Sequence, residues 1–415
     1  MKKRHKYPRK KLIVALSAIG PGLFLIGYNI GTGSVTTMAK VGAEHGMMLT
    51  WALALSCIFT YVLMVAYGKT TLVTGHTALH NIKGNFKIGK VLAIYIMIAL
   101  IIGEILALIG IFGIVSELIQ EGISMITGKP GPSTAWITLV LAIMLYALLW
   151  VGKYQSFEKI LMFFVILMGL SFITVFFMVR PDFGEIVRGL VPSIPEKEGS
   201  FRLVAAIAGT TCSAAVFIMR STVVVEKGWN INNLHAEKKD ALVSASTMFF
   251  LSFIIMAVAA GTLKVIGLEL NTTLEMISLF RPIGGRFAAF ILILGIVGAG
   301  LSTIFPIILI APWLISDYTG RPRSIQSPMY RILGLVGILF GFVMQFIKTS
   351  PPLLMVFAQA FQALILPAVV IPVLILINRK ILMKGQTAGW MLNTGLGALV
   401  IFSLITSYFA LMDFF

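Results

Sequence analysis

Residues 20–39 read GPGLFLIGYNIGTGSVTTMA, an apolar stretch interrupted by glycines and hydroxyl side chains around residues 31–34. A second stretch of the same kind, residues 205–217, reads AAIAGTTCSAAVF and is interrupted at residues 209–213. Glycine and β-branched residues weaken a helix, and backbone left unpaired in lipid costs several kcal/mol. Each stretch therefore predicts a membrane helix broken at its middle, where the freed backbone faces protein or a water-filled cavity.

The two interruptions match each other, because each holds a Gly-Thr pair that a serine soon follows. Broken helices at corresponding places in two halves of a chain are typical of the mid-membrane binding site of a secondary transporter. The alternative is that the small residues only allow close helix packing. We favour close packing for Gly20 and Gly22, and a binding site for residues 31–34 and 209–213.

The composition of the whole chain is that of a membrane protein. Of its 415 residues, 58% are apolar and 12% are charged, whereas a globular domain has roughly 45–50% and about 25%. This excludes a soluble enzyme and a disordered chain. Since about 20 apolar residues cross a bilayer, we predict an all-α polytopic membrane protein with about eleven spans. The predicted spans are 12–42, 46–68, 91–117, 135–152, 160–179, 203–225, 241–266, 286–316, 330–347, 352–377 and 390–412.

The charge distribution predicts the orientation. The net charge is +17, and most of the 33 lysine and arginine residues fall in segments that are cytoplasmic if the N-terminus is inside. Because cytoplasmic loops of membrane proteins collect Lys and Arg, this bias predicts a multi-pass plasma (inner) membrane protein with its C-terminus outside. Residues 1–11 form a basic cytoplasmic tail, and residues 12–412 form a single transmembrane domain. Cytoplasmic loops therefore explain the positive net charge, and nucleic acid is not expected as a partner.

Few acidic side chains lie inside the predicted spans. Glu104, in LIIGEILALIG, is the acidic residue deepest in an apolar run, and a carboxylate at the bilayer centre costs about 2.5–3.5 kcal/mol on insertion scales. We favour a proton-relay role; the alternative is a protonated side chain that hydrogen-bonds a neighbouring helix. Gln359 either offers a carbonyl oxygen to a solute or bonds between helices, and Gln362 lies on the same span. No nucleotide-binding or hydrolytic motif and no acid–base pair inside a span are evident, which predicts a protein that is not an enzyme and needs no cofactor.

Several motifs in order along the chain resemble the natural-resistance-associated macrophage protein (Nramp) family of divalent metal transporters. The first is GPGLFLIGY in residues 20–28, and Glu104 in the third span is another. The others are LVTGHTALH (72–80), RPDFGEIVRGLVPSIP (180–195), ILGIVGAGLSTIF (293–305) and FAQAFQALILPAVVIPVLILINRK (357–380). The resemblance covers nearly the whole chain.

The resemblance implies a LeuT-type fold, in which five helices are repeated in inverted orientation with one extra span. The repeats would cover about 12–179 and 203–377, and the extra span 390–412. It also implies a proton-linked secondary active transporter (a symporter) of divalent metal ions.

The sequence departs from the family pattern where the family binds metal. The family positions for the metal ligands are Gly31, Ser34, Ser213 and Gln359, and here only the glutamine is kept. The family has Asp and Asn at the first two positions and a methionine at the third. Its acidic pair in the third span corresponds to Ile101 and Glu104. We therefore expect an altered substrate site.

The predicted substrate-binding residues are Gly31, Thr32, Gly33, Ser34, Thr210, Thr211, Ser213 and Gln359, with Glu104 as the proton relay. All of the binding groups are neutral, whereas a divalent ion usually has at least one anionic ligand. Three hypotheses follow: an altered divalent metal transporter, a carrier of a monovalent ion or small polar solute, and a membrane sensor that does not transport. The expected partners are a small ion or solute, the lipid bilayer and protons as coupling ions.

Overall fold

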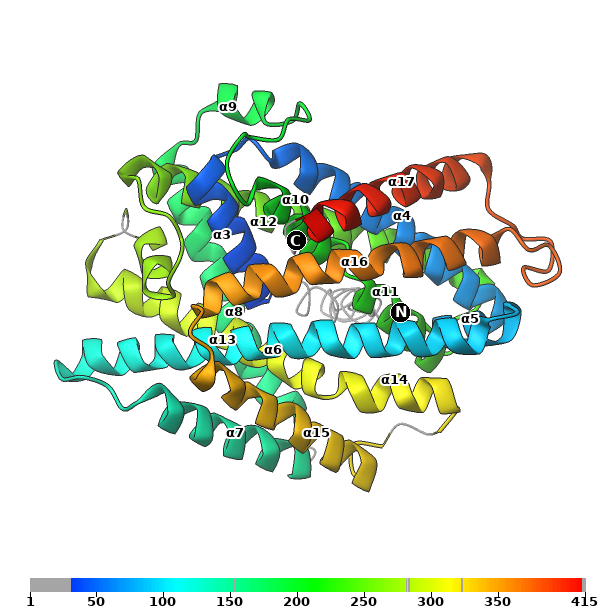
Figure 1. Cartoon of the computed structure of the whole chain (residues 1–415), viewed down its shortest axis with the longest axis horizontal. Coiled ribbons are helices and arrows are strands. Elements are labelled where there is room, and N and C mark those ends of the chain that lie inside the picture. The colour runs from blue at the N-terminus through cyan, green and yellow to red at the C-terminus, as the bar shows by residue number, and fades with distance from the viewer. Residues whose placement is uncertain (1–30, 152–153, 281, 283, 322–323, 413–415) are drawn as a thin grey trace, which may run out of the picture.

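The computed structural model of the chain describes residues 31–151, 154–280, 282, 284–321 and 324–412. Within these ranges the protein is built from helices and loops, without a strand. Figure 1 shows an elongated bundle in which the long helices run in roughly the same direction. Nine of the described helical segments are long and apolar enough to cross a membrane, and a shorter apolar helix covers Phe163–Val179.

The observed helices follow the predicted spans closely. The first five spans correspond to α3 (Thr32–His45), α4 (Thr50–Thr74), α6 (Gly89–Thr127), α7 (Thr134–Val151) and α8 (Tyr154–Val179). The other six correspond to α10 (Ser200–Thr211) with α11 (Ala214–Glu226), α12 (Leu234–Thr262), α13 (Gly285–Ile308) with α14 (Ile310–Thr319), α15 (Pro328–Phe340) with η4 (Gly341–Phe346), α16 (Pro351–Ile377) and α17 (Trp390–Met412). The connections contain α5 (Ala78–Asn85), α9 (Phe183–Arg188), η1 (Ile231–Asn233), η2 (Lys264–Ile266) and η3 (Leu274–Phe280).

The predicted break in the sixth span is confirmed. Helix α10 ends at Thr211, Cys212 caps it, and Ser213 has extended backbone (φ −62°, ψ 124°) before α11 begins. In the first span, α3 begins at Thr32 with Gly31 as its extended N-cap, inside the predicted interruption. The earlier part of that span, residues 12–30, lies outside the described residues.

The eighth predicted span, 286–316, corresponds to one membrane-length segment, Phe287–Thr319, which holds an interruption that the sequence did not predict. The structure divides it at Leu309 into α13 and α14. Pro306 and Pro312 flank the division. Because proline has no N–H and its ring clashes with the carbonyl four residues earlier, the two prolines interrupt the hydrogen-bond ladder on both sides of Leu309.

Helix α16 holds the centre of the bundle, where it packs against α3, α6, α10 and α17. Figure 1 shows α16 and α6 side by side along much of their length. Helix α10 approaches α16 closely at Gly209, where an added Cβ would lie 1.8 Å from the backbone oxygen of Gln359. The absence of a side chain at Gly209 therefore sets the spacing of α10 and α16.

We expect Gly209→Ala to lower the free energy of unfolding by about 3 kcal/mol or more, because overpacking against a backbone atom cannot be relieved by a rotamer change. Thermal unfolding of the purified protein in detergent measures this. The matched control is Gly397→Ala in α17, where an added Cβ meets no atom within 4 Å. That change should leave stability equal or up to about 1 kcal/mol higher. Equal unfolding temperatures for the two variants would contradict the prediction.

Candidate functional site

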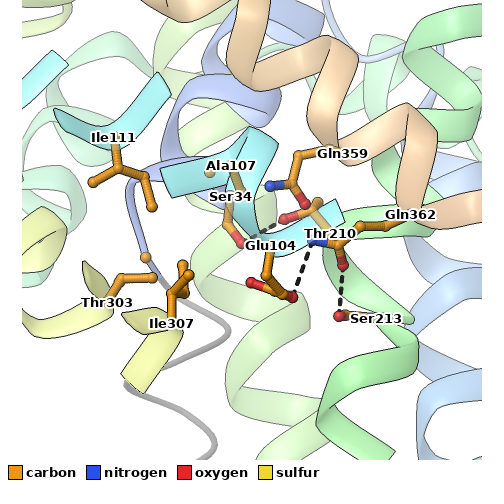
Figure 2. Close-up of a pocket in the computed structure, with 12 residues that line it drawn as sticks. Ser34, Glu104, Ala107, Ile111, Thr210, Ser213, Thr303, Ile307, Gln359 and Gln362 are labelled. Carbon is orange, nitrogen blue, oxygen red and sulfur yellow. Dashed lines mark hydrogen bonds between the residues drawn. The ribbon is translucent and has the colours of Figure 1, made fainter. Parts of the chain in front are cut away.

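A small buried cavity lies where the broken helix meets four other elements. It holds about 30 Å³ of space, enough for one or two water molecules, since about 10–15 Å³ on this measure holds one. Figure 2 shows the residues that line it, which come from the start of α3, from α6, from the α10–α11 break, from α13 and from α16. They are Gly31, Gly33, Ser34, Glu104, Ala107, Ile111, Thr210, Ser213, Thr303, Ile307, Gln359 and Gln362.

The two predicted interruptions touch each other at this cavity. The hydroxyl oxygens of Ser34 and Thr210 are 2.9 Å apart and share a hydrogen bond, which Figure 2 shows as a dashed line. Both side chains are buried, with exposed fractions of 2% and 5%. Two stretches that are far apart in the sequence therefore contribute their hydroxyl groups to one polar surface.

A second chain of hydrogen bonds joins the break to Glu104. Ser213 Oγ donates to Gln362 Oε1 at 2.8 Å, and Gln362 Nε2 donates to Glu104 Oε1 at 3.2 Å. Figure 2 shows the three side chains converging from the α10–α11 break, from α16 and from α6. Glu104 therefore lies at the end of a hydrogen-bond chain that begins at the break in the sixth span.

Gln359 lies one helical turn from Gln362 on α16 and faces the start of α3. An added Cβ on Gly33 would lie 2.6 Å from Gln359 Nε2. Gln359 Nε2 also lies 3.4 Å from the sulfur of Met355. Gly33 thus leaves space for the amide beside the cavity.

Thr303 of α13 fills the space beside Gly31. A Cβ added to Gly31 would lie 2.3 Å from Thr303 Oγ1 and 3.2 Å from Thr303 Cβ. The hydroxyl of Thr303 is held in place, because it donates to the carbonyl of Ala299 at 2.8 Å. A larger residue at position 31 therefore needs a smaller one at position 303.

The structure gathers most of the residues predicted for the site. Six of the eight predicted binding residues line the cavity, as does Glu104. Thr32 and Thr211 do not. The hydroxyl of Thr211 donates to the carbonyl of Ile207 within α10, and the Thr32 side chain is buried close to Gly300 of α13.

Sequence reasoning missed several lining residues. Ala107 and Ile111 follow Glu104 at helical spacing, so they share its face of α6 and were open to prediction. Thr303 and Ile307 lie on α13, and nothing in the sequence shows which face of that helix meets the break. Gln362 was noted only as a polar residue on its span, although it connects Ser213 to Glu104.

The electrostatics of the cavity depend on one carboxylate. Of the twelve described residues that line the cavity, Glu104 is the acidic one. Its exposed fraction is 2%. Helix α10 ends at the cavity and brings partial negative charge, whereas α3 and α11 begin there and bring partial positive charge. No group of three or more His, Cys, Asp or Glu side chains gathers as a metal site within the described ranges.

A buried ion cluster lies on α11, farther along the chain from the cavity, although the sequence predicted no acid–base pair inside the spans. Arg220 Nε lies 2.7 Å from Glu237 Oε1, and Arg220 Nη2 lies 2.7 Å from Asp240 Oδ2. All three side chains are buried. Glu237 and Asp240 stand at the start of α12, between the predicted sixth and seventh spans, so the sequence did not indicate this ion cluster.

A membrane helix broken at its middle, which meets the start of α3 at a small buried polar cavity, is typical of a secondary transporter. The family model described as "Natural resistance-associated macrophage protein-like" matches residues 22–413. The chain therefore belongs to the Nramp family, as the sequence motifs indicated. It is a multi-pass membrane protein with the all-helical LeuT-type fold that the resemblance implied.

Individual relatives agree with this assignment. The chain is 24% identical over 428 residues to the divalent metal cation transporter MntH of Staphylococcus saprophyticus, covering 96% of this chain and 92% of that one. The manganese transporter of Eremococcus coleocola, solved in complex with an aromatic bis-isothiourea compound, matches with a TM-score of 0.72 at 14% identity, over 99% of this chain and 88% of the other. The nucleobase-cation-symport-1 transporter Mhp1, with bromovinylhydantoin bound, matches with a TM-score of 0.62 at 14% identity, over 95% and 92%.

Proposed function

We propose that this protein is a secondary transporter of a small, oxygen-coordinated metal cation, with the cavity between the breaks as its binding site. The observation that carries the proposal is the convergence of Glu104 with hydroxyl groups from both interrupted stretches and with two amide groups of α16 around one ion-sized space. The MntH relatives are named divalent metal cation transporters, which supports a divalent ion.

The size of the cavity argues against an organic substrate. Pockets for small organic ligands enclose roughly 300–1,000 Å³, whereas this one holds about 30 Å³. A single ion, with or without one water molecule, fits such a space. The carrier of a polar organic solute, one of the hypotheses from the sequence, is therefore disfavoured.

The chemistry of the lining groups favours a hard cation. Hydroxyl, amide and carboxylate oxygens suit ions such as Mg²⁺, Ca²⁺ and Mn²⁺. The family methionine is replaced by Ser213, so the site offers a hydroxyl oxygen in place of a soft sulfur ligand. A monovalent cation is the second candidate, because one carboxylate among neutral oxygens matches a single positive charge.

Flux into proteoliposomes loaded with an ion-sensitive dye tests the proposal. The purified protein is assayed with Mn²⁺, Mg²⁺ and Rb⁺ as separate probes, at two values of pH. Saturable uptake of a divalent ion supports the proposal, and faster uptake under an inward proton gradient supports proton coupling. Uptake of Rb⁺ alone favours the monovalent candidate. Absence of flux with every ion would support the sensor hypothesis and contradict transport.

The contact between Gly31 and Thr303 gives a sharper test. We expect Gly31→Asp alone to be inactive or poorly folded, because its Cβ would lie 2.3 Å from Thr303 Oγ1. Gly31→Asp with Thr303→Ala removes the hydroxyl and provides a second carboxylate at the position where the family has aspartate. This double variant should bind Mn²⁺ about tenfold more tightly, as expected for an added anionic ligand.

Thr303→Ala alone is the control, and it should keep the wild-type affinity within about threefold, since it changes no charge. The affinity is measured as the KM for Mn²⁺ flux. A double variant that is folded but binds Mn²⁺ no better than the wild type would argue against position 31 as part of the ion site.

The predicted orientation has support from the distribution of charge in the fold. Helix α5 contacts the ends of α4, α11, α14 and α16, so these ends share one face of the bundle. Lys83, Lys87 and Lys90, as well as the loop cations Arg379, Lys380 and Lys384, lie at this face. A face rich in Lys and Arg is expected in the cytoplasm, and this supports our proposal that the end of α17 lies outside, at the plasma membrane.

A further inference from the structure

A basic groove lies on the same face of the bundle, away from the ion cavity. It is lined by Thr74 and His76 after α4, by Asn85 at the end of α5, and by residues 379–382 and 384 of the loop that joins α16 to α17. Its volume is about 690 Å³, which is in the range of ligand-binding pockets. We name it the headgroup groove.

The lining of the headgroup groove is cationic. Arg379, Lys380 and Lys384 line it together with His76, and none of its described lining residues is acidic. Uncompensated cations that converge on a concave surface attract an anion, and phosphate oxygens are a preferred partner of Arg and Lys.

The loop that carries these cations is held in a defined conformation. Met383 is fully buried and anchors it, Lys69 Nζ donates to the carbonyl of Thr387 at 2.8 Å, and Asn378 and Asn393 exchange hydrogen bonds through their amides. Arg379 donates to the carbonyl of Asn85 and lies over the ring of Phe86, with its guanidinium carbon 4.9 Å from the ring centroid.

Apolar side chains beside the cations indicate a lipid as the source of the phosphate. Ile381 lines the groove and is 96% exposed, and Trp390 at the start of α17 is 77% exposed. Tryptophan is typical of the membrane–water interface. Ile371 and Ile375 are exposed one turn apart on the last turns of α16, which offers a path for an acyl chain next to the groove.

We infer that the headgroup groove binds the phosphate of an anionic phospholipid while its acyl chains run along α16. Basic pockets between membrane helices on the cytoplasmic side are suited to such headgroups. This inference does not depend on the identity of the transported ion.

Native mass spectrometry of the full chain in detergent tests the inference, with phosphatidylglycerol and phosphatidylcholine as probes. The wild type should bind phosphatidylglycerol in preference. Arg379→Gln with Lys384→Gln should weaken this binding by about 30-fold, as expected for two cations at a membrane surface. Lys380→Gln with Lys384→Gln is the second variant, because it keeps the contacts of Arg379 with Phe86 and Asn85.

The matched control is Lys238→Gln with Lys239→Gln, which removes two exposed cations from α12 outside the groove and should leave the preference unchanged. Inorganic phosphate, added as a competitor, should not displace the lipid at millimolar concentration. The inference is overturned if both groove variants bind phosphatidylglycerol as the wild type does, if the control loses it equally, or if phosphate alone displaces it.

Discussion

Glu104→Gln is expected to lower divalent metal flux by at least roughly 100-fold, because the loss of a ligand costs a metal site more than the 10–100-fold that the loss of an outer partner costs. Among the described residues that line the cavity, Glu104 is the one that carries a carboxyl group. Gln362 Nε2 donates a hydrogen bond to Glu104 Oε1 at 3.2 Å and holds it in place. Glutamine keeps the shape of the side chain and removes its charge. A divalent ion bound only by neutral oxygens then lacks an anionic ligand to offset its dehydration.

The measurement is ion flux into proteoliposomes at several values of pH. Glu121→Gln is the matched control, because it removes the same charge from the same helix α6 at a residue that does not line the cavity. We expect the control to keep its flux and its pH dependence. Since Glu104 is also the proposed proton relay, any residual flux of Glu104→Gln should no longer respond to pH. Wild-type flux in this variant would rule out Glu104 as a ligand, and an unchanged pH response would rule it out as the relay.

The sequence predicted the spans well because membrane helices need long apolar runs, and that constraint acts locally. The break at Cys212 and Ser213 was open to prediction for the same reason, since it depends on weak helix formers close together. Thr32 and Thr211 belong to the two interrupted stretches, but their side chains do not line the cavity. The sequence shows which residues interrupt a helix; which face they present depends on the neighbouring helices.

Contacts between distant parts of the chain could not be predicted in the same way. Gln362 becomes important only because α16 lies between Ser213 and Glu104. Thr303 matters because α13 brings it against Gly31, and the glycine alone gives no indication of this. The ion cluster at Arg220 was missed because its acidic partners follow 17 and 20 residues later, where the hydropathy pattern indicates a loop.

This ion cluster should matter greatly for stability. Arg220 is fully buried, with its guanidinium held by both Glu237 and Asp240 at 2.7 Å. Gly68 of α4 packs on the same cluster, because a Cβ there would lie 2.2 Å from Glu237 Oε1. Because α4 packs so closely on the cluster, water has no room to take the place of the arginine side chain beside the two carboxylates. Removal of one partner from a buried ion pair leaves an uncompensated charge, which costs about 3–5 kcal/mol.

We therefore expect Arg220→Met to lower the midpoint of thermal unfolding in detergent by roughly 5–10 °C. Arg188→Met, at an exposed position in α9, is the control and should leave the midpoint unchanged. The triple variant Arg220→Met, Glu237→Gln and Asp240→Asn has no buried charge at the cluster, so it should recover at least about half of the loss. If the triple variant is as unstable as Arg220→Met, the cost comes from lost packing of the arginine side chain. If Arg220→Met unfolds at the wild-type temperature, the cluster does not hold α11 to α12.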